Sequence, residues 1–174
     1  MKVRARQFNL YLTLAALTLL CGCQTGKQEK LVGALRVHLE ANASNLGTGQ
    51  TISLPRSTPV LVTIATAPVL TEANLLAAKV INAPGGFALE MQFDQNGTWL
   101  LEQYSAANPG KHFVIFAQWG EKTVTNRWLA APLITHRIAD GILAFTPDAS
   151  RAEAEQLVHD LNPVIAKFRK GSFK

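Results

Sequence analysis

The segment HFVIFAQW, residues 112–119, decides the fold, because it is the strongest strand candidate in the chain. Residues 113–116 at its centre are apolar at four consecutive positions. A strand with one face in water alternates apolar and polar side chains, whereas a strand covered on both faces is apolar throughout. The sequence therefore predicts a central, buried strand, with the other elements arranged around it.

Three strand candidates lie on its N-terminal side. Residues 33–41 alternate between apolar and polar side chains, which predicts a half-buried strand whose polar face carries His38. Residues 51–54 and 60–65 are two further candidates. The stretch before them, residues 42–50, is rich in Asn, Ser, Gly and Thr and is predicted to be a loop.

A hairpin is predicted directly before the first long helix. Thr71 can cap a short helical turn, after which residues 79–82 form a brief strand. Residues 84–86, Pro-Gly-Gly, supply the dihedral angles of a tight turn. Residues 87–93 then place their apolar side chains on one face, so the two strands are expected to pair.

The first long helix is predicted over residues 94–108. Asp94 or Asn96 can cap its N-terminus, and Pro109 with Gly110 ends it. Its apolar stripe, at helical spacing, consists of Leu100, Leu101, Tyr104 and Ala107.

The C-terminal part is predicted to hold two strands and a second helix. The strands cover residues 122–128 and 141–145. The helix begins at a capping box formed by Ser150 and Glu153, and Pro163 marks its expected end. The predicted fold class is α+β: a two-layer sandwich of a mainly antiparallel sheet with two principal helices, plus an N-terminal signal helix.

The first 22 residues have the layout of an export signal. Basic residues precede an apolar run at 10–20, whose 11 residues fall short of the roughly 20 that a membrane-spanning helix needs. The run ends in Leu20-Cys21-Gly22-Cys23, which resembles the lipobox of bacterial lipoproteins. The resemblance implies cleavage between Gly22 and Cys23 and a lipid on Cys23. The alternatives are an ordinary secretory signal or a short membrane anchor.

Removal of this signal changes the charge and the cysteine content. The mature chain would keep 14 basic and 12 acidic residues, a net charge of +2, and no thiol. The low charge removes most of the support for nucleic-acid binding, and the absence of a thiol excludes redox chemistry and cysteine-ligated metals. Under the sorting rule of enteric bacteria, Gln24 after the lipidated cysteine favours the outer membrane. The basic residues Lys167, Arg169 and Lys170 form either a solvated tail or a contact with lipid headgroups.

Six short motifs between residues 70 and 162 occur in an order that points to a known family. They are Gly97 with Leu101 and Tyr104, Asn108-Pro109-Gly110-Lys111, the strand 113–117, Ala131-Pro132-Leu133-Ile134, Ile138-Ala139-Asp140-Gly141, and Thr146 ahead of Glu153-Ala154. Together they resemble the head subdomain of the first periplasmic domain of SecD, part of the SecDF accessory complex of the protein-export translocon.

The composition along the chain and these resemblances together predict a domain organisation. It comprises a signal (1–22), a tether (23–32), an N-terminal β segment (33–70), a SecD-head-like α+β domain (71–163) and a basic tail (164–174). SecD carries membrane helices tied to proton flow. The sequence has no second apolar run near 18 residues, so the resemblance implies a binding module without a motor.

The sequence offers little catalytic chemistry. The four histidines lack metal-ligand spacing and are expected at the surface, and no cofactor or metal is predicted. One loop stands out as a possible binding site for an anionic group: Pro132, His136, Arg137, Asp140 and Gly141. A deep pocket holding its histidine, arginine and aspartate would favour an enzyme.

The three tryptophans are expected in the core, unless Trp119 and Trp128 face outward together as a contact patch. The leading hypothesis is a non-enzymatic envelope lipoprotein that faces the periplasm and binds an exported chain or an envelope complex. The alternative is a structural lipoprotein that self-associates.

Overall fold

The computed structural model describes residues 33–41, 49–54, 60–121 and 123–171. The predicted signal, Cys23 and the tether therefore lie outside the described residues. The elements, in chain order, are β1 (Ala34–Leu39), β2 (Gly49–Leu54), β3 (Val60–Ala65), β4 (Leu70–Thr71), the 3-10 helix η2 (Glu72–Asn74), β5 (Leu75–Ala83), β6 (Gly86–Phe93), α2 (Gln95–Ala107), β7 (Phe113–Trp119), β8 (Thr125–Ala130), β9 (Ile142–Phe145) and α3 (Arg151–Gly171).

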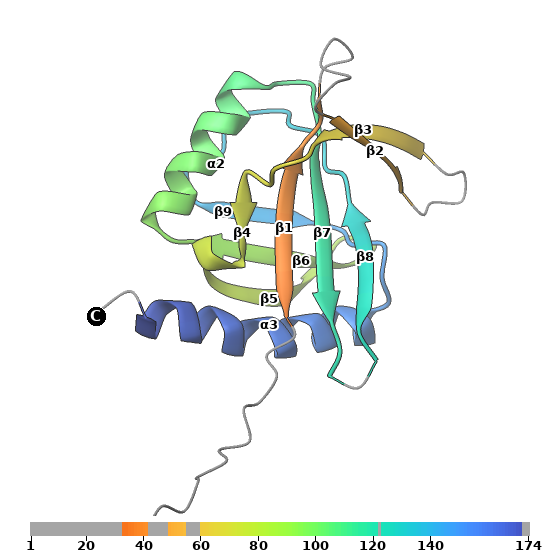
Figure 1. Ribbon diagram of the computed structural model, residues 1–174, viewed down its shortest axis with the longest axis vertical. Helices are drawn as coiled ribbons and strands as arrows, with labels where there is room; N and C mark the ends of the chain where they lie inside the picture. Colours follow the sequence, from red (N-terminus) through yellow and green to blue (C-terminus); the bar gives the residue numbers. More distant parts are fainter. Residues whose placement is uncertain (1–32, 42–48, 55–59, 122, 172–174) are drawn as a thin grey trace, which may run out of the picture.

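The strands form three antiparallel sheets. The largest has the order β4-β1-β7-β8, a second has the order β5-β6-β9, and β2 pairs with β3 in a separate hairpin. The long strands of the first sheet run across those of the second (Figure 1). The predicted α+β sandwich is confirmed, and β7 lies inside its sheet as expected. Residues 49 and 50, predicted to be loop, belong to β2.

Helices α2 (Gln95–Ala107) and α3 (Arg151–Gly171) flank this pair of sheets. Helix α2 lies along one side, and α3 runs beside β5 at the lower edge of the view (Figure 1). The predicted caps are present: Gly97 N donates to Asp94 Oδ1 at 2.7 Å, and Glu153 N donates to Ser150 Oγ at 3.3 Å. The predicted stripe of α2 is wrong at Ala107, which is exposed, whereas Leu101 is fully buried.

Helix α3 does not end at Pro163, as the sequence predicted, but continues to Gly171. A proline inside a helix removes one backbone N–H donor and crowds the preceding turn. Val164 and Ile165 follow immediately, and both are buried. Their apolar contacts keep the chain helical beyond the proline. The predicted basic tail is therefore largely the last turns of a helix.

The main core lies between the two larger sheets and the helices, and a smaller cluster covers the other face of β7. In this smaller cluster Ile52 and Ile64 of the β2–β3 hairpin pack over Val114. His38 lies beneath the same hairpin and is only 7% exposed, which corrects the expectation of a surface histidine. Its Nδ1 lies 2.9 Å from the carbonyl oxygen of Ala65. The hairpin therefore buries the part of this polar face that carries His38, whereas Arg36 on the same face stays exposed.

The tryptophans occupy three different environments. Trp119 is 4% exposed in the main core. Trp128 packs on the opposite face, with its ring edge-on to His38 at 5.4 Å between centroids. Trp99 is 58% exposed, so the expectation that all three are core residues is wrong there. Because Trp119 and Trp128 lie on opposite faces of the sheet, they do not form a contact patch.

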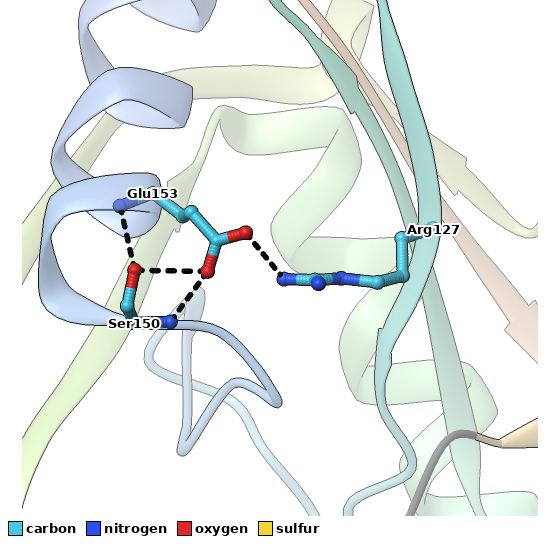
Figure 2. A network of polar contacts seen from close by, with 3 residues as sticks. All are labelled: Arg127, Ser150 and Glu153. Carbon is cyan, nitrogen blue, oxygen red and sulfur yellow. Dashed lines mark hydrogen bonds and ion pairs between the residues drawn. The ribbon is translucent and has the colours of Figure 1, made fainter.

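A polar network fastens the N-terminus of α3 to β8 (Figure 2). Glu153 Oε2 accepts hydrogen bonds from the backbone N–H and the hydroxyl of Ser150, and its Oε1 accepts from Arg127 at 3.2 Å. The Arg127 guanidinium also lies over the Trp119 ring at 5.6 Å. These bonds lower the pKa of Glu153, the backbone bond from Ser150 most. The network places the start of α3 against the first sheet.

Candidate binding site

The predicted binding loop, between β8 and β9, borders a cavity of about 690 Å³. Phe113 of β7 also contributes to its lining. The other lining residues are Pro132, Leu133, Ile134, Thr135, His136, Arg137, Ile138, Ala139, Asp140, Ile142, Leu143 and Ala144. Four of the five residues predicted for the site thus line one cavity, and Gly141 adjoins it in the chain.

Backbone hydrogen bonds hold the loop on the body of the protein. Gly110 N donates to Ile134 O at 2.9 Å, and Ile134 N donates to Lys111 O at 2.8 Å. Further along, Ile138 N donates to the hydroxyl of Ser105 on α2 at 2.9 Å. A loop whose backbone groups are satisfied in this way presents a preformed cavity wall.

Gly141 sets the direction in which the loop enters β9. Its φ is +72°, in the left-handed region that favours glycine. A Cβ atom at this position would lie 2.2 Å from Thr98 Oγ1, so α2 approaches the loop too closely for any side chain. Gly141 O accepts from Phe93 N at 2.9 Å and extends the pairing with β6. Its role is to shape the cavity wall.

The three charged or basic side chains of the loop are each occupied by a different neighbour. Arg137 forms an ion pair with Glu102 of α2. His136 Nδ1 lies 2.9 Å from the hydroxyl of Thr135. Asp140 Oδ1 accepts from Ile142 N at 3.0 Å. An anionic ligand would meet an arginine already neutralised by a carboxylate, so the geometry gives little support to anion binding or to acid–base catalysis.

Apolar side chains dominate the accessible part of the cavity. Leu133 is 52% exposed and Ile142 is 37% exposed, and both border the same hollow. Exposed aliphatic side chains beside a concave surface are typical of contact sites for apolar ligands or polypeptides. The sequence analysis missed both, because an isolated exposed leucine or isoleucine has no recognisable pattern before the fold brings them together.

Strand β9 forms one wall of this cavity and is an edge strand, because it pairs with β6 and, among the described residues, with no other strand. Asp140 caps Ile142 N, so the backbone groups of Ile142 point away from β6. Backbone direction alternates along a strand, which directs the N–H and C=O of Ala144 outward as well. The cavity wall therefore offers the C=O of Ile142 and the N–H and C=O of Ala144 for strand pairing, whereas Asp140 occupies the Ile142 N–H.

The opposite edge of the same sheet is closed. Asn162 of α3 lies beside β5 and pairs with Ala78 as a strand residue would: its Oδ1 accepts from Ala78 N at 3.1 Å, and its Nδ2 donates to Ala78 O at 3.1 Å. An uncovered strand edge invites pairing with another chain. The helix blocks such pairing at β5, whereas the edge at β9 is open.

Neither a metal-binding cluster nor a membrane-spanning helix is found among residues 33–41, 49–54, 60–121 and 123–171. No group of three or more His, Cys, Asp or Glu side chains in these ranges could hold a metal ion. None of the helices in the same ranges has the length and apolar character needed to cross a bilayer.

Taken together, the crossed antiparallel sheets, the flanking helices and the long loop before β9 define an α+β domain with a SecD-like fold. A solved structure of SecDF, described as a membrane component that enhances protein export, matches 75% of this chain with a TM-score of 0.52 and 18% identity. The chain spans 62% of that structure's length. The likeness confirms the predicted fold relationship and carries no further assignment.

Two other SecDF structures are similar at lower scores. One, in the super-membrane-facing form, matches 90% of this chain with a TM-score of 0.47, 16% identity and 33% of its own length. The other, a translocon-associated membrane protein from Thermus thermophilus, has a TM-score of 0.41 at 16% identity, covering 90% of this chain and 34% of its own. No protein-family model and no curated protein matches the sequence.

Proposed function

We propose that this chain is a lipid-anchored, periplasm-facing envelope protein that binds an extended polypeptide segment and is linked to protein export. The proposal names no catalytic residue. Support comes from the SecD-like fold, from the lipobox ending at Cys23, and above all from one structural observation. That observation is the open edge of β9, which borders a cavity of about 690 Å³ with exposed apolar side chains.

The mode of binding follows from the two kinds of group in the cavity. An extended polypeptide offers backbone donors and acceptors to an open strand edge, and these provide affinity without sequence preference. Leu133 and Ile142 add apolar contacts for alternate side chains of such a segment. A chain that has not yet folded exposes both kinds of group, whereas a folded protein has buried them. This favours an exported chain as the occupant.

Peptide binding to the purified protein tests this mode. The probe is a fluorescein-labelled peptide of alternating valine and threonine with lysines at both ends, and binding is read as fluorescence anisotropy. Ala144→Pro removes an outward N–H from an edge strand, where proline is tolerated, and should abolish binding. Ala144→Val keeps the N–H and should bind. Equal affinity of the two variants would contradict strand addition.

A second pair of variants tests the apolar contacts in the cavity. Leu133→Glu places a charge in the cavity and should weaken peptide binding at least roughly tenfold, because a buried apolar contact is lost and a charge is desolvated. Leu61→Glu is the matched control, since Leu61 is 71% exposed on the hairpin and lies outside the cavity. If both variants bound equally well, the cavity would not be the binding site.

Cross-linking in cells tests the link to export. A photoreactive amino acid at position 133 should cross-link to an exported chain arrested during translocation, and the same residue at position 61 should not. Intact mass of the native protein tests the acylation of Cys23. If Ala144→Pro abolished a stable homodimer and no peptide bound to the wild type, the self-associating structural lipoprotein would replace this proposal.

A further inference from the structure

We infer that the C-terminal half of α3 rests on the anionic headgroups of the membrane that holds the protein. This inference rests on the lipid anchor of the proposed function and adds to it an orientation. The exposed side chains of Lys167, Arg169 and Lys170 would make the contact. The cavity beside β9 would then face away from the membrane.

The first observation concerns the position of Gly33, the first residue that the structure describes. Gly33, which precedes β1, packs directly on α3: a Cβ atom at Gly33 would lie 2.5 Å from the backbone oxygen of Asp160 and 2.7 Å from the Cα of Leu161. The nine residues between Cys23 and Gly33 span at most about 36 Å even when fully extended. A lipid on Cys23 would therefore hold the middle of α3 within about 36 Å of the membrane surface.

The second observation is the charge of the helix on the C-terminal side of that point. From Leu161 to Lys174 the sequence has four basic residues and no acidic residue. Arg169 is nine residues beyond Asp160, which is about 14 Å along a helix and within reach of the same surface. The acidic residues of α3, Glu153, Glu155 and Asp160, all precede this half.

A small basic surface suffices because the anchor supplies proximity. Each lysine or arginine close to an anionic membrane strengthens attachment roughly fivefold, which is weak for a protein free in solution. A short tether converts the contact into an intramolecular step with an effective concentration in the millimolar range. Three basic residues can then fix the orientation of a protein that the lipid alone would leave free to rotate.

The position of the cavity follows from the sheet order. Helix α3 covers the β5 edge of the sheet β5-β6-β9, and β9 lies at the other edge (Figure 1). A membrane contact on α3 places the intervening strands between the bilayer and the cavity. The binding edge would then be open to chains on the periplasmic side.

Fluorescence quenching on vesicles tests the inference with the lipidated full-length protein, whose predicted mature form has no free thiol. A single cysteine is introduced at exposed Ala166 on α3, or at exposed Ala139 on the cavity wall as the matched control, and labelled with a fluorophore. The vesicles contain phosphatidylcholine with or without phosphatidylglycerol, and a small fraction of headgroup spin-labelled lipid as the quencher.

The expected result is quenching at position 166 that requires phosphatidylglycerol, and little quenching at position 139. High salt and the triple variant Lys167→Glu, Arg169→Glu, Lys170→Glu should each reduce quenching severalfold. Protein that stays on the vesicles but shows equal quenching at both positions, or no dependence on phosphatidylglycerol, would overturn the docking and leave the anchor standing.

Acylation of Cys23 and membrane contact by α3 can be tested separately. If intact mass shows Cys23 unmodified, while the protein still floats only with vesicles containing phosphatidylglycerol and loses flotation in the triple variant, the anchor fails and the docking stands. Protein that floats with neither kind of vesicle overturns both.

Discussion

Asp160 of α3 accepts a hydrogen bond at 2.9 Å from the backbone N–H of Gly120, in the turn between β7 and β8. Its side chain is only 11% exposed. Gly120 has a φ of +99°, and a Cβ there would lie 2.3 Å from the carbonyl oxygen of Thr123, so the turn holds its N–H in one direction. The carboxylate thus joins the last helix to the end of the central strand.

Replacement of this carboxylate should destabilise the protein. Asp160→Ala removes an ionised acceptor from a partly buried N–H, which costs about 1.5–3 kcal/mol. The measurement is the free energy of unfolding in urea. Glu155→Ala on the same helix is the control. Glu155 is exposed, and its Oε1 lies 3.9 Å from Arg151 Nη1, so this surface ion pair contributes little to stability. Equal destabilisation by the two variants would contradict a specific role for Asp160.

Acid should weaken the protein through Asp160 and Glu153. Burial raises the pKa of Asp160, but hydrogen bonds from His159, Gly120 and Gln156 outweigh it and lower the pKa below 3.8. The backbone N–H of Ser150 is the largest cause that lowers the pKa of Glu153 below 4.5. A carboxyl whose pKa is lower in the folded state stabilises the fold above its unfolded pKa, and this stabilisation is lost as pH falls through the folded value.

The free energy of unfolding attributable to these two groups should therefore be constant above about pH 5 and fall below about pH 4. The measurement is a series of urea unfolding titrations that starts at about pH 6 and continues well below about pH 4. In the double variant Asp160→Asn, Glu153→Gln the fall should be smaller, because two of the responsible groups no longer titrate. An identical pH profile for the double variant and the wild type would refute this assignment.

Gly141→Ala should destabilise the loop before β9. The positive φ costs about 1–2 kcal/mol for an alanine, and the clash with Thr98 adds to it. Thr98→Ala removes the hydroxyl that a Cβ would meet at 2.2 Å, so the double variant should recover the steric part and retain the backbone part. A double-mutant cycle of unfolding free energies measures this coupling. Strictly additive effects would contradict the close approach of α2.

Pro163→Ala should stabilise the protein. Pro163 is exposed inside α3, and alanine would restore a backbone donor to the preceding turn. Proline costs up to about 3 kcal/mol in a helix interior, so we expect a gain of about 1–3 kcal/mol in unfolding free energy. Ala166→Ser, at another exposed position of α3, is the control and should change stability little. A loss of stability in Pro163→Ala would indicate that the proline shapes the helix for its packing.

Most of the predictable features depend on neighbours in the sequence. The apolar run of β7, the turn at Gly85 and the caps at Asp94 and Ser150 are recognisable because a few consecutive residues determine them. Their outcomes agree with the structure. The extension of α3 beyond Pro163 was not predictable from the helix itself, since contacts with other elements offset the local cost.

The features that the sequence did not reveal join distant segments. Asn162 and Ala78 are separated by 84 positions, and nothing in either neighbourhood indicates that an amide will close a strand edge. His38 is buried by a hairpin that follows it in the chain. For the binding loop, the sequence predicted some of the residues that line the cavity. It did not predict the ion pair between Arg137 and Glu102, which neutralises the charge of the arginine.

The pairing of Asn162 with Ala78 also limits how many strands can be added to the sheet β5-β6-β9. A sheet with two open edges can accept strands on both sides and polymerise, as in fibrous aggregates. In the sheet β5-β6-β9 one edge is occupied by a helix, so the protein itself offers a single edge for strand addition. Two copies that met edge to edge at β9 would likewise consume both available edges and form a closed pair. The peptide binding proposed above would therefore be limited to one strand at a time on this sheet.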